Sequence, residues 1–352
     1  MDYKKTFETF IDTLIREDGS DLHLATGRVP AVRVNGELIF LANHQSLTQE
    51  DMTGIAQSIL SPEHYQHFLK TQELDFSYEY QGTTRLRGNI FVQQNRYVMV
   101  LRLIPHVKTL QELNLPTILA DFARKKQGFF LVVGPVGQGK SATMASMIGL
   151  INEERAAHIL TIEDPVEYVY EQKKSIIDQR EVGIDTADFQ HALHSAFRQD
   201  VNVILVGEMR SAETMATAVT AAETGHLVLS TLHTNNASQT IDRIIDSFPA
   251  AQQDQIRIQL ASSLIGIFSQ RLVPRIAGGR IPAYELLINT TAVSNLIREK
   301  RTHEIDMVIE TGFEQGMIDM NRSLVDLVRQ GEITVEHAYA YSINPKNLER
   351  LL

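Results

Sequence analysis

Residues 134–142, GPVGQGKSA, combine glycines, a lysine and a serine at the spacing of a phosphate-binding loop. Gly134, Gly139, Lys140 and Ser141 fit the pattern G-x-x-x-x-G-K-[ST]. In this pattern backbone N–H groups converge on an anion, the lysine bridges the β and γ phosphates, and the hydroxyl ligates Mg²⁺. The alternative is a glycine-rich bend without a ligand. The loop follows an apolar run and precedes a helical pattern, which favours nucleotide binding. The predicted binding residues of the loop are Gly134, Pro135, Val136, Gly137, Gln138, Gly139, Lys140, Ser141 and Ala142.

Acidic residues follow two later apolar runs. Glu163 ends the run HILTIE, and Glu208 follows VNVILVG. A hydrophobic strand that ends in an acid is what a phosphate-loop site uses to hold Mg²⁺ and to orient the attacking water. We therefore predict that Glu163 and Glu208 share metal coordination and water activation, with either one as the base. The alternative for Glu208 is an ordinary acidic loop residue.

Two histidines and two arginines are further candidates. His233 follows the apolar run HLVLSTL, where it would sense the γ-phosphate or simply be hydrogen-bonded. His226 opens the same run, about 20 Å away if the segment is extended, so the two cannot both contact one phosphate. Arg87 and Arg102 lie on two candidate strands near the N-terminus. A transferring phosphoryl group often needs an arginine from outside the loop, but these residues alone favour surface arginines on a solvated sheet.

The elements that would position these residues alternate between strands and helices from about residue 117 onward. This alternation predicts an α/β domain with a parallel sheet, whose ligands bind at the carboxyl ends of the strands. Past residue 236 the pattern becomes mostly helical, with one hairpin around Gly278-Gly279.

The first hundred residues predict a separate α+β domain. An apolar helix face comes first, and Asn35-Gly36 between AVRV and ELIFL is a strong hairpin signal. Residues 105–116 lack clear periodicity and indicate a linker. The predicted division is 1–104 for the first domain, 105–116 for the linker and 117–352 for the second domain.

The composition restricts the class of protein. Hydrophobic content of 43% and charged content of 22% are those of a soluble globular chain, and no apolar stretch approaches the length of a membrane span. The absence of cysteine excludes disulfides and cysteine-ligated zinc and fits a reducing compartment, so we expect a cytoplasmic protein. A net charge of −10 argues against an open, sequence-independent grip on nucleic acid.

The phosphate loop, IEDPVEY, GEMR and ETGHLVLSTLHTNNA occur in this order, and together they resemble the secretion ATPase superfamily of type II secretion and type IV pili. Within it the chain is most similar to the pilus retraction ATPases that power twitching motility. The likeness runs from SDLHL at 20–24 through RLRGNIF and SQRLVPR to the tail. Assembly ATPases of these systems usually carry a four-cysteine zinc module, so its absence favours retraction over extension.

The resemblance implies an α/β fold in which an N-terminal PAS-like domain precedes a RecA-like P-loop ATPase domain with a helical C-terminal region. It also implies ATP with Mg²⁺ as cofactors and a homohexamer in which each nucleotide lies between the two domains of a subunit. By the family pattern, Arg87 and Arg102 reach the phosphates as subunits close. The remaining roles that it implies are Glu163 in the Asp box, Glu208 in the Walker B element, and His226 and His233 in the His box, with Arg210 of GEMR and His226 among the nucleotide-binding residues.

The implied partner is the membrane platform protein at the pilus base, at the cytoplasmic face of the inner membrane. Val136, Gln138 and Ala142 depart from the usual loop GPTGSGKST, and Ser294 replaces an arginine in AVSNLIRE. These departures leave open an accessory subunit of weak hydrolysis that works beside a paralogous retraction ATPase. A nucleic-acid motor on the same core is a further alternative, which the acidic balance disfavours.

Overall fold

The computed structural model describes residues 2–34, 36–82 and 84–352. It divides into two compact units, Met1–His106 and Val107–Leu352. Each unit has its own sheet and its own core.

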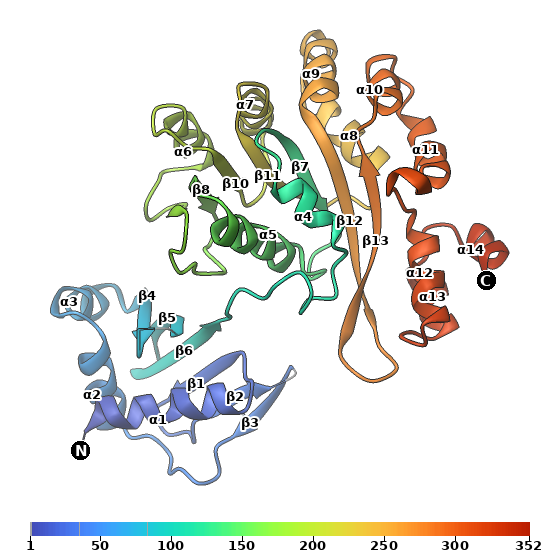
Figure 1. Cartoon of the computed structure of the whole chain (residues 1–352). Coiled ribbons are helices and arrows are strands. Elements are labelled where there is room, and N and C mark those ends of the chain that lie inside the picture. The colour runs from blue at the N-terminus through green and yellow to red at the C-terminus, as the bar shows by residue number, and fades with distance from the viewer. Residues whose placement is uncertain (1, 35, 83) are drawn as a thin grey trace. The chain divides into compact units, whose positions relative to one another are not determined.

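The N-terminal unit is an antiparallel sheet of six strands in the order β3-β2-β1-β6-β5-β4, with three helices (Figure 1). Helix α1 buries Phe7, Phe10, Ile11 and Leu14, the apolar residues that recur at helical spacing. The elements are α1 (Tyr3–Arg16), β1 (Asp21–Ala25), β2 (Ala31–Val34), β3 (Glu37–Phe40), α2 (Gln49–Ile59), α3 (Pro62–Thr71), β4 (Glu73–Tyr80), β5 (Thr84–Gln93) and β6 (Arg96–Ile104).

The α+β content predicted for this unit agrees with these elements, whereas the PAS-like assignment stays a prediction. Strands β2 and β3 pair antiparallel, as a hairpin requires. The predicted turn Asn35-Gly36 includes Asn35, which lies outside the described residues.

The C-terminal unit is a sheet of seven strands in the order β13-β12-β7-β11-β10-β8-β9. All neighbouring pairs are parallel except β12 with β13. Its first elements are α4 (Ile118–Ala123), β7 (Gly128–Val133), α5 (Lys140–Glu154), β8 (His158–Glu163), β9 (Ile176–Glu181), α6 (Phe189–Ala196), β10 (Val203–Val206), α7 (Ala212–Glu223), β11 (Leu227–Leu232), α8 (Ala237–Asp246) and α9 (Ala250–Ser263). The remaining ones are β12 (Leu264–Pro274), β13 (Arg280–Ile288), α10 (Thr291–Arg298), α11 (Ile305–Thr311), α12 (Met320–Arg329), α13 (Val335–Tyr341) and α14 (Pro345–Leu351).

The central strands of this sheet are buried along their whole length because helices cover both faces. Every residue of β7, β10 and β11 is buried. One hydrophobic cluster joins these strands to α6, α7 and α9, and a second joins them to α4 and α5. This arrangement is the one that parallel sheets with crossover helices adopt, and it confirms the α/β prediction.

Three features were not expected from the sequence. Strand β9 was not predicted, and β12 and β13 form long strands of the main sheet rather than an isolated hairpin within a helical region. The irregular segment predicted as a linker over 105–116 belongs to the C-terminal unit from Val107 onward. The reason is burial: Leu110, Leu113 and Leu115 pack against the cluster around α4 and α5.

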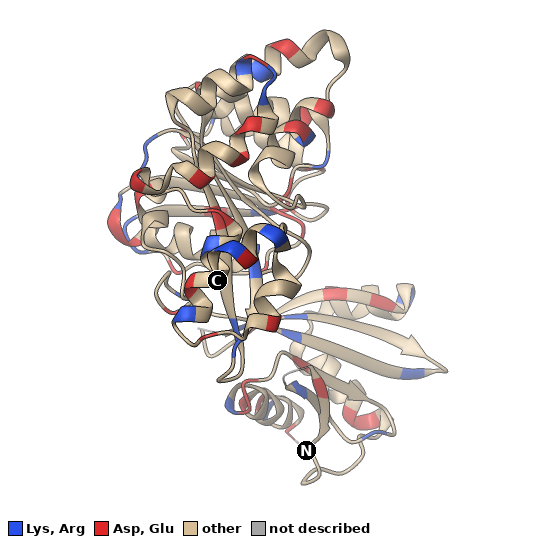
Figure 2. Cartoon of the chain, turned by 90° about the vertical axis from the view of Figure 1, so that its right-hand side faces the viewer, with Lys and Arg blue, Asp and Glu red and all other residues tan. Residues whose placement is uncertain are grey.

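Within the described ranges, no helix combines the length and the apolar character that crossing a membrane demands. In the view of Figure 2, acidic and basic residues are interspersed along the helices of the C-terminal unit.

Candidate nucleotide-binding site

The loop between β7 and α5 has the backbone geometry of an anion cradle. Gly134, Gly137 and Gly139 have φ values of 145°, 77° and 78°, which side chains rarely allow. At Gly134 a Cβ atom would also lie 2.5 Å from the carbonyl oxygen of Gln270. Helix α5 begins at Lys140, directly after the loop, so its free N–H groups and the positive end of its dipole are directed at the same place.

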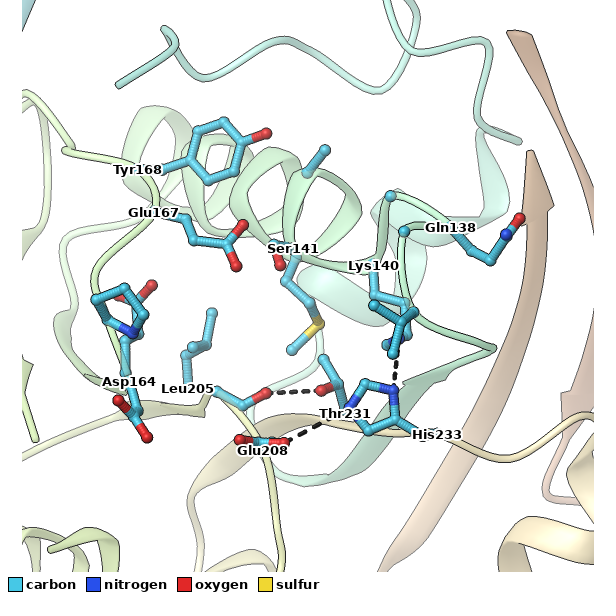
Figure 3. A pocket seen from close by; sticks show the side chains of 18 of the residues that line it. Gln138, Lys140, Ser141, Asp164, Glu167, Tyr168, Leu205, Glu208, Thr231 and His233 are labelled. Carbon is cyan, nitrogen blue, oxygen red and sulfur yellow. Dashed lines mark hydrogen bonds and ion pairs between the residues drawn. The ribbon is translucent and has the colours of Figure 1, made fainter. Parts of the chain in front are cut away.

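A cavity of about 530 Å³ opens beside this loop (Figure 3). Its walls come from the loop and from the carboxyl ends of β8, β10 and β11, where a parallel sheet binds its ligands. The predicted residues that line it are Val136, Gly137, Gln138, Gly139, Lys140, Ser141, Ala142, Glu163, Glu208, Arg210 and His233. Of the other predicted loop residues, Gly134 and Pro135 contribute carbonyl groups that hold the lysine.

The Lys140 side chain is buried and held in place by its own loop. Its Nζ atom donates to the carbonyl oxygens of Gly134 at 2.8 Å and Pro135 at 2.9 Å. The same atom lies 3.2 Å from Nδ1 of His233. Burial lowers the pKa of Lys140 from 10.5 to about 8, although the Glu208 carboxylate acts in the opposite direction. A bound phosphate would favour the charged form of this lysine.

The two predicted acids emerge from neighbouring strands. Ile162 of β8 pairs with Val206 of β10, so Glu163, the last residue of β8, and Glu208, two residues beyond β10, lie at the carboxyl ends of adjacent strands. Glu163 is buried, and its Oε1 atom accepts hydrogen bonds from Thr161 at 2.6 Å and Gln179 at 3.3 Å. Burial raises the pKa of Glu163, as expected for a carboxylate that can take up a proton.

Glu208 is the more accessible acid and is paired with two basic groups. It forms an ion pair with Arg210, and its Oε2 atom lies 3.5 Å from Nε2 of His233. His233 therefore stands between Lys140 and Glu208, with one ring nitrogen toward each (Figure 3). Both sequence interpretations of His233 are compatible with these contacts, and its role as a sensor of the γ-phosphate stays a prediction.

The oxygen donors around the cavity suit Mg²⁺ that arrives with a nucleotide. Mg²⁺ in such sites is held by one or two carboxylates, phosphate oxygens and water rather than by a cage of protein ligands. Ser141, Glu163 and Glu208 line one cavity and offer a hydroxyl and carboxylates. Within the described residues there is no cluster of three or more histidine, cysteine or acidic side chains that could hold a metal by itself.

The structure does not bring His226 to this cavity. His226 precedes β11, whose six buried residues separate it from His233. Its Nδ1 atom hydrogen-bonds to the carbonyl oxygen of Ala221 at 3.0 Å, and its ring packs edge-on against Phe197 with centroids 5.7 Å apart. The nucleotide contact that the family pattern implied for His226 is therefore absent from the described cavity.

Arg87 and Arg102 belong to the N-terminal unit, where they are direct cross-strand neighbours on β5 and β6. Like charges placed opposite each other in a sheet are destabilising. One carboxylate offsets part of this cost: buried Asp21 on β1 accepts from Nε of Arg102 at 2.9 Å. The side chain of Arg102 remains 73% exposed, so its terminal nitrogens are accessible for an anion.

Sequence reasoning missed the part of the cavity that comes from the distant strands β12 and β13. Leu272 and Arg280 line it, as do Glu167, Tyr168 and Tyr170 from the segment after β8. The motif SQRLVPR at 269–275 covers the end of β12, but nothing in its spacing indicated contact with the loop.

One buried acid near the site gives a pH-dependent prediction for stability. Glu285 on β13 accepts from the N–H of Ala237 at 2.8 Å, and burial raises its pKa from 4.5 to about 8, with Asp306 and Asp319 adding to the rise and Arg271 opposing it. Between these two pKa values the folded state keeps Glu285 protonated, whereas the unfolded chain has released that proton. The free energy of unfolding therefore falls as the pH rises from about 4.5 to about 8.

Glu285→Gln keeps the acceptor for Ala237 and removes the titration. We expect the variant to match the unsubstituted protein near pH 5 and to exceed its Tm at pH 8, by about 2–4 °C for each kcal/mol regained. Thermal unfolding at both pH values checks this. An equal difference in Tm at the two values would contradict it.

Comparisons with known proteins identify the family of this chain. Residues 99–278 match the family described as Type II/IV secretion system protein. The type IV pilus retraction ATPase PilT of Pseudomonas aeruginosa is 42% identical over 94% of this chain and 96% of its own. The type IV pilus ATPase PilU of the same organism is 39% identical over 98% of this chain and 91% of its own.

A crystal structure of the pilus retraction motor PilT with bound ADP is similar to the whole chain. It has 47% sequence identity and a TM-score of 0.88, covering 97% of this chain and 98% of that one. The family match spans half of the sequence, and both relatives are matched over nearly their full length. The chain therefore belongs to the Type II/IV secretion system protein family, and its relatives within that family include the pilus ATPases PilT and PilU.

Proposed function

We propose that this protein is an ATP-hydrolysing motor that powers retraction of a type IV pilus and thereby twitching motility. The observation that carries the proposal is the cavity in which His233 stands between the loop lysine, Lys140, and the strand-end acid, Glu208. The similarity to PilT supports the cellular role.

In this proposal the loop amides and Lys140 hold the β and γ phosphates, and Ser141 ligates the Mg²⁺ that accompanies ATP. When bound, Mg²⁺ would neutralise the negative charge that develops on the phosphates. Glu208 and Glu163 share metal coordination and activation of the attacking water. Glu208 is the more accessible of the two acids, whereas Glu163 lines the same cavity from a buried position and its raised pKa suits it to take up a proton.

In the proposed closed state Arg87 and Arg102 complete the site. The free energy of nucleotide binding then drives rotation of one domain relative to the other. The exposed guanidinium of Arg102 and its repulsive pairing with Arg87 support this role, because the sheet retains two adjacent positive charges at a cost in stability. Arg210, paired with Glu208, adds a further positive charge at the cavity.

The proposed assembly is a homohexamer at the cytoplasmic face of the inner membrane, peripheral to it. There it would turn the platform protein at the pilus base and let pilin return to the membrane. A motor of this kind has no need of nucleic acid as a partner.

Steady-state ATP hydrolysis by the purified full chain tests the enzymatic part, with Lys140→Ala as the control. We expect Mg²⁺-dependent turnover that the control lacks, because the ammonium group of Lys140 is the positive charge that the loop places on the β and γ phosphates. A rate indistinguishable from that of Lys140→Ala would contradict it. Deleting the gene tests the cellular part, since pili that still shorten would argue against retraction.

A second candidate is an accessory retraction subunit that hydrolyses little by itself. The similarity to PilU over 98% of this chain and the departures at Val136, Gln138 and Ala142 favour it. Adding the paralogous motor separates the two candidate functions. Little turnover by this chain alone, with turnover by the mixture above that of the paralogous motor alone, identifies the accessory subunit.

A further inference from the structure

Gln138 is the loop residue at which the sequence departs most in size from the usual GPTGSGKST, where a serine stands. The structure gives this glutamine a partner that a serine cannot reach. Its Oε1 atom accepts a hydrogen bond from the backbone N–H of Leu272 on β12 at 2.7 Å. The two residues are 134 positions apart in sequence.

The contact lies just beyond the point at which β12 stops pairing with β7. Pairing of β12 with β7 ends at Ser269 and Val133, because β7 then gives way to the phosphate loop. The N–H of Leu272 lies beyond that point and would otherwise lack a strand partner on this side. Beyond the end of β7, the Gln138 side chain therefore accepts the hydrogen bond that a neighbouring strand would otherwise accept.

A second hydrogen bond holds the same residue from its backbone. Nε2 of Gln270 donates to the carbonyl oxygen of Gln138 at 2.8 Å, while Oε1 of Gln270 accepts from Thr143 on α5 at 2.7 Å. Gln270 and Thr143 are 2% and 1% exposed, so the bond between them is shielded from water and strengthened by the low local dielectric, while the bond to Gln138 is partly buried.

The packing of the loop glycines shows how closely β12 supports the loop. A Cβ atom at Gly134 would meet the carbonyl oxygen of Gln270 at 2.5 Å, and one at Gly139 would lie 3.1 Å from its Nε2 atom and 3.2 Å from Leu272. β12 thus contacts the loop before and after Gln138.

We infer that Gln138 and Gln270 form a clamp that fixes the phosphate loop in its binding conformation, and that β12 is a supporting wall of the nucleotide site. Gln138 is a positioning residue: it acts through the backbone amides of its loop. The inference rests on the proposed function, since it presupposes that nucleotide phosphates bind there. Preorganised amides contact the phosphates before and during the reaction, so the clamp contributes to binding rather than to the chemical step.

The experiment compares Gln138→Met, which keeps the length and removes the acceptor, with Gln138→Ser, the usual family residue. Gln127→Ser, an exposed glutamine just before β7, is the matched control. We expect both Gln138 variants to raise the Kd for Mg²⁺-ADP and the KM for Mg²⁺-ATP about three- to tenfold, the value of one neutral hydrogen bond, with kcat unchanged. Titration calorimetry and steady-state kinetics measure these constants, and thermal unfolding without nucleotide establishes that the variants are folded.

A cycle with Gln270→Ala tests the coupling. If the clamp acts as one unit, Gln138→Met costs less affinity in the Gln270→Ala background than in the unsubstituted chain. A Kd equal to that of Gln127→Ser, a fall in kcat without a change in KM, or full additivity would each overturn the inference. If Gln138→Met is poorly folded, Gln138→Ser carries the same comparisons. Unchanged ADP binding by Lys140→Ala would instead refute the proposed nucleotide site itself.

Discussion

Glu208→Gln is expected to lower kcat for ATP hydrolysis by at least about 100-fold while ATP and ADP still bind, because an amide cannot accept the proton of the attacking water. The substitution keeps the size of the side chain and leaves its carbonyl oxygen near His233. Single-turnover hydrolysis together with nucleotide titration separates the chemical step from binding.

Glu163→Gln is the matched control, since Glu163 is the last residue of the adjacent strand β8. If Glu208 is the base, this control loses less activity than Glu208→Gln. Near-normal turnover by Glu208→Gln would contradict the assignment and transfer the role of base to Glu163.

Replacing both Arg87 and Arg102 by alanine is expected to lower kcat by about 10³- to 10⁵-fold, the range of an arginine that stabilises a transferring phosphoryl group from outside the loop. ADP binding to the loop should persist, because Lys140 and the loop amides lie in the other unit. The double variant also takes the Arg102 donor from buried Asp21, so the Tm of the N-terminal unit should fall even though the repulsive pair is gone. Steady-state kinetics, ADP titration and thermal unfolding measure the three effects.

Arg33→Ala is the control for this pair. Arg33 on β2 also neighbours Asp21, with its Nε atom 4.0 Å from that carboxylate, but it is not one of the arginines matched by the family pattern. Turnover of the double variant equal to that of Arg33→Ala would show that Arg87 and Arg102 are surface arginines, the interpretation that the residues alone favoured.

The part of the site that is contiguous in sequence could be predicted, because its chemistry is local. The spacing of Gly134, Gly139 and Lys140 determines a loop between strand and helix, and the apolar runs before Glu163 and Glu208 determine buried strands with acids at their ends. Sheet order then brings those ends together. Gly139, Lys140, Glu163 and Glu208 line one cavity, whereas their roles stay predictions.

The remaining part depends on contacts that no local pattern encodes. Gln270 and Leu272 reach the loop across more than 130 positions of sequence, and the sequence of a strand such as β12 gives no indication of its neighbour. The segment over 107–116 looked like a linker because its leucines lack a period, yet irregular backbone can still bury Leu110, Leu113 and Leu115. Periodicity reports regular elements, whereas burial of irregular chain is a property of the tertiary fold.

Positions 134 and 137, the first two glycines of the loop, should differ in the substitutions that they tolerate. Gly134 is restricted twice, by a positive φ and by the carbonyl oxygen of Gln270, whereas Gly137 has a positive φ but open space around its Cα. Asparagine and aspartate visit the left-handed region more readily than other side chains. A codon library selected for twitching should therefore return glycine alone at 134, and occasional asparagine beside glycine at 137.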